Sequence, residues 1–428
     1  MKKRDSITRS SIKYSYLNGI TDAIVKVFTS GPLLTIYAVG IGMSNANIGF
    51  LQSILPFSNL LHLFVAQFLE KGSSPRKIAW ISSLIARVFL LLIAISVFLK
   101  DTTLGICLFV IPYILAHVCT SITGGAFWPW CKGFVPNRIM VSYFAFRTQY
   151  IIAAKMLTFL FATGIIYLIH AYRQELELYC YSLFFVLAFF AGLVCTYALY
   201  KVKDVKLKHI SEISFKQKIK IAFANKNFLF LFFGIGLANF VLTFYTSFNI
   251  VFLLKSLKLT VPIVMCFTLF SNLIEILIAP LWKKYSNVYK ATTLLAYSMI
   301  AYVLSIIILI TLSLVSIDND LCLILLIVIT ALFIGIGSSG FLITTNSISI
   351  VYVPQKMSSI YLSLLNIGRF GSNGLGATCG GLLLGYLANN NYKWLIFFSI
   401  CLFLYFITAI LANKIKPVNH INLTSIPI

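Results

Sequence analysis

Long apolar segments separated by short polar turns follow one another along almost the whole chain of 428 residues. Each segment holds about 20 residues or more, which is enough for a helix to cross the roughly 30 Å hydrocarbon core of a membrane. Backbone groups in lipid must be paired within the protein, so we expect helices rather than open strands. The pattern predicts twelve spans, at about residues 17–42, 47–69, 78–99, 103–127, 146–169, 178–200, 227–254, 260–282, 291–316, 320–345, 357–388 and 392–412.

Composition agrees with a membrane protein. Sixty per cent of the residues are hydrophobic and only 11% are charged, whereas a soluble domain carries about 25% charged residues. The nine cysteines are scattered, and no pair or Cys/His cluster has metal-ligand spacing. We therefore expect no metal site, no disulfide and no cofactor.

The positive charges fall mostly on one side of the predicted helices. Of the 34 Lys and Arg residues, 25 lie in the two termini and in the loops on the side of those termini, and five lie on the other side. The positive-inside rule then predicts that both ends are cytoplasmic and that the protein spans an inner membrane several times. Because topology accounts for the net charge of +23, we expect no nucleic-acid partner.

Three short sequences recur about half a chain apart. Phe57–Leu61 (FSNLL) returns as Phe270–Ile274 (FSNLI) at an offset of 213, and Phe28–Ser30 (FTS) returns as Tyr245–Ser247 (YTS) at an offset of 217. Val135–Arg138 with Tyr143 returns as Val353–Lys356 with Tyr361, at an offset of 218. These echoes predict two pseudo-symmetric six-helix bundles, which is mainly a transporter architecture. The predicted domains are residues 1–200, a basic cytoplasmic linker 201–226, residues 227–412 and a tail 413–428.

Two loop sequences carry a resemblance to a known family. After the second span, Glu70 and Lys71 stand at the acid and the first base of the motif G-x-x-x-D-[RK]-x-G-[RK]-[RK], and Arg76 and Lys77 supply more bases. The leading Gly of the motif is Ala66 here, and the second Gly has moved. The segment Trp128–Pro136, with Arg138 and Arg147, is similar to a loop between spans 4 and 5 of some bacterial proteins. Together with the six-plus-six arrangement, these motifs resemble the major facilitator superfamily, abbreviated MFS.

The resemblance implies an all-α fold of two six-helix bundles that transports a small solute. It also implies that five residues help to hold one face closed, namely Glu70, Lys71, Arg76, Arg138 and Arg147. The chain departs from the family pattern in the loop after span 8, which has bases but no acid. It also lacks the Arg of span 4 found in proton-coupled members and the Gly-Pro motif of drug antiporters.

Ionisable residues inside the spans are the candidates for binding, because each costs about 2.5–3.5 kcal/mol to insert into the membrane. Asp22 and Lys26 are four residues apart, so they share one helix face and can form an ion pair. Asp22 is a candidate proton- or substrate-binding carboxylate, and the alternative is a pair that only lowers the cost of insertion. Gly31 and Pro32 are expected to break or kink the span near this site.

His62 and Glu275 occupy matching places in the two halves, at the offset of 213. Glu275 is a candidate coupling carboxylate, and the alternative is a neutral acid that bonds to a neighbouring helix. His62 is a candidate relay group or a packing residue.

Two further cations complete the candidate list. Arg369 lies in a glycine-rich span and is a candidate to bind an anionic group of the solute or to pair with an acid such as Glu275 or Asp22. The alternatives are a side chain that snorkels to the interface and a structural bridge between helices. Lys155 is ranked above Arg87, because span 5 lines the cavity in the resembled family whereas span 3 is peripheral. The excess of cations over acids inside the spans leans toward an anionic or zwitterionic solute.

The sequence therefore predicts a monomeric secondary active transporter, coupled to protons by symport or antiport, whose partners are a small solute and the lipid bilayer. We expect no enzymatic activity. Three alternatives stay open: an MFS-like sensor or scaffold that has lost transport, a lipid-linked sugar flippase, and a membrane-embedded enzyme.

Overall fold

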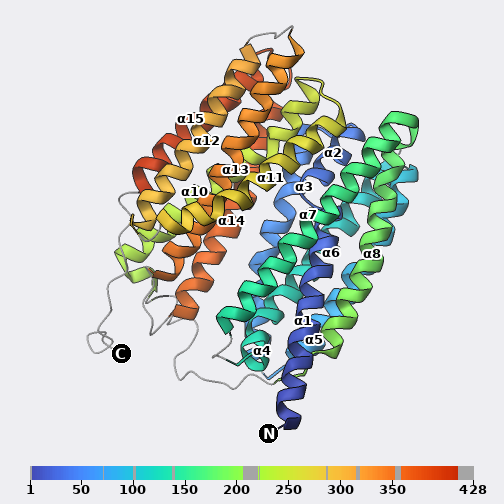
Figure 1. Ribbon diagram of the computed structural model, residues 1–428, viewed down its shortest axis with the longest axis vertical. Coiled ribbons are helices and arrows are strands. Elements are labelled where there is room, and N and C mark those ends of the chain that lie inside the picture. The colour runs from blue at the N-terminus through green and yellow to red at the C-terminus, as the bar shows by residue number, and fades with distance from the viewer. Residues whose placement is uncertain are drawn as a thin grey trace. The chain divides into compact units, whose positions relative to one another are not determined.

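The computed structural model describes residues 2–70, 72–99, 103–136, 140–205, 220, 222–285, 288–314, 319–351 and 358–412. Helices are the only regular elements in this part of the chain (Figure 1). The predicted all-α class is thereby confirmed. Lys71, Arg138, most of the linker (206–219 and 221) and the tail (413–428) lie outside the described residues.

The helices of the first half follow the predicted spans closely. They are α1 (Lys2–Thr29), α2 (Pro32–Gly40), α3 (Asn45–Ser58), η1 (Asn59–Leu61), α4 (His62–Glu70), α5 (Pro75–Ser96), η2 (Val97–Leu99), α6 (Thr103–Phe134), α7 (Met140–Tyr172), η4 (Gln174–Leu176) and α8 (Glu177–Lys201).

The second half has fewer interruptions. Its helices are α10 (Lys226–Lys255), α11 (Val261–Tyr285), α12 (Ala291–Leu314), α13 (Asp320–Val351), α14 (Ser358–Tyr386) and α15 (Lys393–Ala412).

Ten helices of the described part are long and apolar enough to cross a membrane. The two other predicted spans are present as helices of a different character. Span 2 is divided by η1 into α3 and α4. Span 11 is the continuous α14, whose glycines and polar side chains lower its hydropathy. The chain is therefore a multi-pass membrane protein.

The first span breaks where the sequence predicts. Gly31 has a φ of +67°, a left-handed conformation that glycine adopts without a steric penalty. Pro32 follows as the first residue of α2, where its missing N–H leaves no helical hydrogen bond unmade. As a result α1 ends at Thr29, two turns beyond Asp22.

The repeated FSNL sequence adopts two different structures. In the first copy, Pro56 lies inside α3 and the chain tightens into the 3₁₀ turn Asn59–Leu61 before α4. In the second copy, Phe270–Ile274 lies inside the uninterrupted α11. A proline removes one backbone donor and bends a helix, so the presence of Pro56 in only one copy accounts for the difference.

The chain divides into two compact units. One comprises Met1–Ile210 together with Leu253–Cys266, and the other comprises Ser211–Phe252 together with Phe267–Ile428. In the first unit α1 and α5 both pack against α8, and α5 also packs against α6 (Figure 1). In the second unit α12 packs against both α13 and α15. The domain boundaries expected from the sequence remain a prediction.

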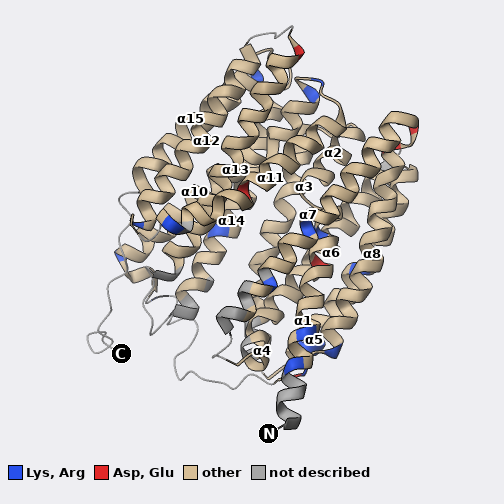
Figure 2. Ribbon diagram, viewed as in Figure 1, with Lys and Arg blue, Asp and Glu red and all other residues tan. Residues whose placement is uncertain are grey.

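The start of the basic linker is fixed to the first unit. The indole of Trp130 donates to the carbonyl of Lys203 at 2.9 Å, and the Lys203 N–H donates to Ser11 Oγ at 3.2 Å. The Ser74 hydroxyl donates to Asp204 Oδ2 at 2.6 Å. Figure 2 shows that basic residues gather at the N-terminal end of α5 and nearby on α1, whereas most of the ribbon carries no charge.

Candidate functional site

A cluster of three charged side chains lies inside the first unit. Asp22 and Lys26 stand one turn apart on α1, and their Oδ2 and Nζ atoms are 2.8 Å apart. Arg87 of α5 adds a second cation, with Nη2 3.5 Å from Asp22 Oδ1. The Arg87 side chain is 4% exposed, Asp22 is 25% exposed and Lys26 is 47% exposed. The predicted Asp22–Lys26 pair is confirmed, and a second cation from another helix joins it.

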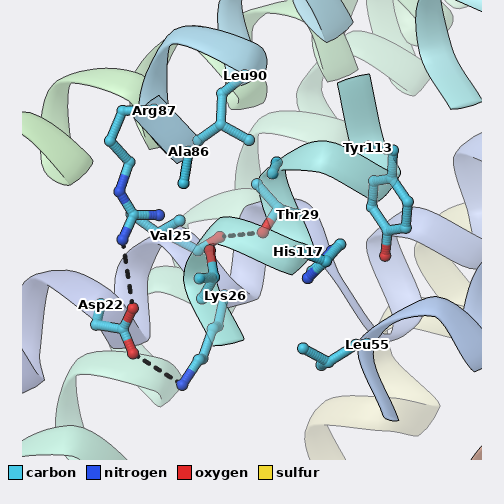
Figure 3. A pocket seen from close by; sticks show the side chains of 12 residues that line it. Asp22, Val25, Lys26, Thr29, Leu55, Ala86, Arg87, Leu90, Tyr113 and His117 are labelled. Atoms are coloured by element: carbon cyan, nitrogen blue, oxygen red, sulfur yellow. Dashed lines mark hydrogen bonds and ion pairs between the residues drawn. The ribbon is translucent and has the colours of Figure 1, made fainter. Parts of the chain in front are cut away.

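The cluster lines a pocket formed by α1, α3, α5 and α6 (Figure 3). Tyr113 and His117 of α6 contribute further polar groups, with their ring centroids 4.3 Å apart. The remaining lining residues are mostly apolar: Val25, Thr29, Leu55, Ala86, Leu90, Ala116 and Thr120. Figure 3 shows the Asp22 carboxylate between the guanidinium of Arg87 and the ammonium of Lys26. Because apolar walls lower the local dielectric, these charges interact more strongly here than they would in water.

A glycine on α8 makes room for Arg87. A Cβ atom placed on Gly192 would lie 2.2 Å from Arg87 Cδ and 2.7 Å from its Nε. The arginine stem therefore lies against bare backbone at this position. Arg87 Nη2 also contacts Cys195 Sγ at 3.8 Å, and the same sulfur accepts from Asn18 Nδ2 at 3.0 Å. Helices α1, α5 and α8 thus meet around one buried guanidinium.

Two candidates of the first unit lie outside this pocket. His62, at the start of α4, packs against α6, where a Cβ on Gly124 would be 3.3 Å from its Nε2. The neighbouring Asn59 accepts from Ser121 Oγ at 2.9 Å, so this turn is bonded to α6. Lys155 is exposed on α7 and does not line the pocket. Arg87, which the sequence ranked below Lys155, is the cation that reaches Asp22.

Glu275 is hydrogen-bonded within the second unit. Its Oε2 accepts from the hydroxyl of Ser338 on α13 at 2.9 Å. The two helices approach closely there, since a Cβ on Gly335 would lie 2.5 Å from the carbonyl oxygen of Ser271. The carboxyl group of Glu275 is therefore partly enclosed between α11 and α13.

Arg369 also bonds to α13. Its Nη1 donates to Asn346 Oδ1 at 3.0 Å. The sequence suggested an acid as its partner, and the hydrogen bond that the structure assigns to it is with a neutral amide. Ser338 and Asn346 carry no charge and no unusual spacing, so no sequence signal marked them as partners of Glu275 and Arg369.

Arg147 connects three helices of the first unit. Its guanidinium lies over the rings of Phe127 and Trp128, at 4.8 and 5.8 Å from their centroids. Its Nη2 also donates to Asn18 Oδ1 at 3.4 Å. The sequence places Trp128–Pro136 in a loop, but α6 continues to Phe134, so all but the last two residues of this motif are helical. The longer helix is what brings Phe127 and Trp128 beneath Arg147.

The other predicted gate residues are only partly described. Arg76, at the start of α5, stacks over the ring of Tyr200 at 5.7 Å. Glu70 ends α4, and its side chain is not described. Lys71 and Arg138 lie outside the described residues. In the described part of the chain, no three His, Cys, Asp or Glu residues come together in a group that could hold a metal ion.

The fold matches solved transporter structures over nearly the full length. A mutant form of the nucleoside transporter NupG has a TM-score of 0.74 at 14% identity, and the match covers 96% of this chain and 99% of that one. The peptide transporter POT in complex with sulfate has a TM-score of 0.70 at 11% identity, with 96% and 98% covered. The D-xylose-proton symporter has a TM-score of 0.68 at 13% identity, again with 96% and 98% covered.

No family model and no curated protein sequence matches the chain. At these identities the likeness establishes the fold alone, which this chain shares with the three transporters.

Proposed function

We propose that the protein is a secondary active transporter, which moves a small solute across the inner membrane by alternating access and couples this movement to protons. The observation that carries the proposal is the charged cluster of Asp22, Lys26 and Arg87 beside a pocket in an otherwise apolar bundle. Buried charges in a membrane are costly, and they usually mark a substrate or ion pathway. The fold of the three transporters described above supports the same conclusion.

In this proposal the Asp22 carboxylate is the primary proton site. While ionised, it holds Lys26 and Arg87 through its two oxygens. A proton on either oxygen removes the negative charge and releases both cations to face the pocket. If solute binds more tightly to one of these two states, protons and solute are linked through a shared equilibrium.

Glu275 is the second proton site of the proposal. As a carboxylate it accepts from Ser338, and as a carboxylic acid it can donate to the same hydroxyl. The hydrogen bond between α11 and α13 can therefore persist in either protonation state with its direction reversed. The second unit therefore also holds a carboxyl group that can take up and release a proton without losing its bond to α13.

Arg147 and Arg76 are proposed as braces. Arg147 fixes α7 to α6 and α1, and Arg76 fixes α5 to α8 through Tyr200. Such contacts keep a bundle rigid, and rocking of a rigid bundle is how alternating access works in transporters of this fold. The abundance of Lys and Arg near both termini supports their placement in the cytoplasm.

The test is uptake of a mixed metabolite library into proteoliposomes, with and without an imposed proton gradient. We expect at least one solute to accumulate under the gradient. Asp22→Asn should abolish this accumulation, whereas Glu275→Gln should weaken it. Arg173→Gln, which changes an exposed cation beyond α7, is the matched control and should leave uptake intact.

Two results would count against the proposal. If no solute is taken up by protein whose folding has been verified, the protein is a sensor or scaffold that has lost transport. If Asp22→Asn leaves proton-driven uptake unchanged, the cluster is only a structural ion pair.

A further inference from the structure

We infer that the pocket beside Asp22 is an anion site, in which Arg87 and His117 bind the carboxylate or phosphate group of the transported solute. This inference rests on the transporter proposal and specifies the chemistry of the same pocket. It proposes that Arg87 and His117 contact the solute directly, and it assigns the solute to a chemical class.

The first argument is charge. Among the lining residues there is one acid, Asp22, and there are two cations, Lys26 and Arg87. Lys26 lies at 2.8 Å from Asp22, which is the distance of a charge-assisted hydrogen bond. Arg87 lies at 3.5 Å, which is longer than such bonds and leaves its attraction only partly used. The pocket therefore holds a net positive charge, which repels a cationic solute and attracts an anion.

The second argument is the shortage of acceptors around Arg87. A guanidinium has five N–H donors, and that of Arg87 is nearly fully buried. Its Nε has no hydrogen-bond partner among the described residues, and its hydrogen bond from Nη2 is to the Cys195 sulfur at 3.8 Å. Sulfur is a weak acceptor. Nε faces Gly192 and is not available to the pocket. The weak bond from Nη2 to sulfur and its long 3.5 Å contact with Asp22 leave the terminal Nη groups as the donors that would bind an anion.

The third argument comes from another helix. His117 on α6 is buried, and its Nδ1 has no hydrogen-bond partner within the described part of the chain. The ring lines the same pocket as Arg87 and packs edge-on against Tyr113. A buried polar atom without a partner costs roughly 1–3 kcal/mol. In the tautomer that carries its proton on Nδ1, His117 would donate to an anionic oxygen in the pocket, and Arg87 would donate to the same anion from α5. An apolar solute would offer neither group an acceptor.

The test is binding to the purified protein in nanodiscs made only of phosphatidylcholine, so that no anionic lipid competes. The probes are inorganic phosphate, the carboxylates acetate, lactate and succinate, the neutral amides acetamide and lactamide, and methylammonium. Binding is followed by the rise in melting temperature and by calorimetry. We expect saturable binding of phosphate or of a carboxylate, and none of the amides or of methylammonium.

Substitutions then locate the site. Arg87→Gln should lower the affinity for the anion by about ten- to a hundredfold, because it removes charge-assisted hydrogen bonds. Arg87→Lys, which keeps the charge without the planar fork, should lose less, and His117→Gln should lose about tenfold or less. Arg173→Gln should bind as the unaltered protein does. If Arg87→Gln does not fold, Arg87→Lys and His117→Gln carry the test.

Equal binding of an amide and its carboxylate would overturn the inference, as would unchanged anion affinity in the foldable Arg87 and His117 variants. Competition by added phosphatidylglycerol against phosphate would identify a lipid headgroup as the natural anion. Anion binding without uptake would keep the anion site and defeat the transporter proposal. Proton-driven uptake of a neutral solute that Arg87→Gln does not affect would keep transport and defeat the anion site.

Discussion

Three helices of the first unit and the three corresponding helices of the second unit meet around different kinds of side chain. In the first unit α1, α5 and α8 meet around the charges of Asp22 and Arg87. In the second unit the corresponding helices α10, α12 and α15 meet around the rings of Tyr245, Tyr302 and Tyr405. The offset of 217 carries Asp22 onto Asn239, a buried neutral amide that donates to Ile235 in its own helix.

The tyrosine cluster is built for stability. Its ring centroids are 5.3–6.0 Å apart, which is the range in which aromatic pairs attract. The hydroxyl of Tyr245 forms a hydrogen bond with Ser305 Oγ at 2.9 Å, so at least one hydroxyl of the tyrosine cluster has a partner between these helices. A triad of packed rings needs no counter-ion and has no charge to bury. The comparison teaches that the two halves share a helix arrangement, and that the place where these three helices meet holds charged side chains in the first unit and tyrosine rings in the second.

The largest expected difference between the two sets of three helices, α1, α5 and α8 against α10, α12 and α15, is in the free energy of unfolding lost when the polar residue of α1 or of α10 is removed. Asp22→Ala should lower the free energy of unfolding by about 2–4 kcal/mol, because it leaves the buried Arg87 without its counter-ion. Asn239→Ala should cost about 1 kcal/mol, since it removes one hydrogen bond within a helix. Reversible unfolding in mixed micelles measures both. Equal costs for the two changes would contradict the view that only the first set of helices depends on charge.

The next effect concerns the glycine beneath Arg87. Gly192→Ala should destabilise the protein by about 1–3 kcal/mol, because the new methyl group would overlap the arginine stem. Gly164→Ala on α7 is the matched control, since no atom lies within 4 Å of its added Cβ. That change should stabilise the helix by about 0.5–1 kcal/mol. The double variant Gly192→Ala with Arg87→Ala should recover part of the loss, and an additive loss would show that the two residues do not interact.

The smallest expected changes in the free energy of unfolding come from removing single hydroxyl groups of the tyrosine cluster. Tyr245→Phe should cost about 1 kcal/mol, because the buried hydrogen bond between Tyr245 and Ser305 is lost, while Ser305 keeps its bond to the carbonyl of Tyr302. Tyr405→Phe should raise the free energy of unfolding by about 1 kcal/mol, because it removes a buried hydroxyl that has no hydrogen-bond partner among the described residues. Thermal melts of the two variants side by side give the comparison. A loss of stability for Tyr405→Phe would reveal a role for that hydroxyl beyond ring packing.

Sequence periodicity and charge predicted most of the fold. The helix positions, the break at Gly31–Pro32 and the Asp22–Lys26 pair all depend on neighbours within a few residues, so they can be read from the chain. The arrival of Arg87 at Asp22 depends on how α5 lies against α8, and no local pattern encodes that contact. Lys155 was ranked above Arg87 because of the position of span 5 in the resembled family, and Arg87 is the residue that lies beside Asp22 in the structure.

The hydrogen-bond partners of Glu275 and Arg369 could not be predicted from the sequence for a different reason. Ser338 and Asn346 are ordinary polar residues of an apolar helix, and many such residues only bond to their own backbone, as Thr344 does to Gly340. Their contacts with Glu275 and Arg369 arise from the close approach of helices at glycines such as Gly335. Helix contacts of this kind are set by shape rather than by periodicity.

The fit of Arg87 against Gly192 also has an evolutionary consequence. A mutation that enlarges residue 192 first would displace the arginine, and a mutation that shortens residue 87 first would leave an empty space against α8. On each route the protein with a single mutation is less stable than both the starting protein and the protein with both mutations. In a set of relatives, residues 87 and 192 should therefore change together, and a glycine at position 192 should report that the arginine, and the chemistry it serves, has been retained.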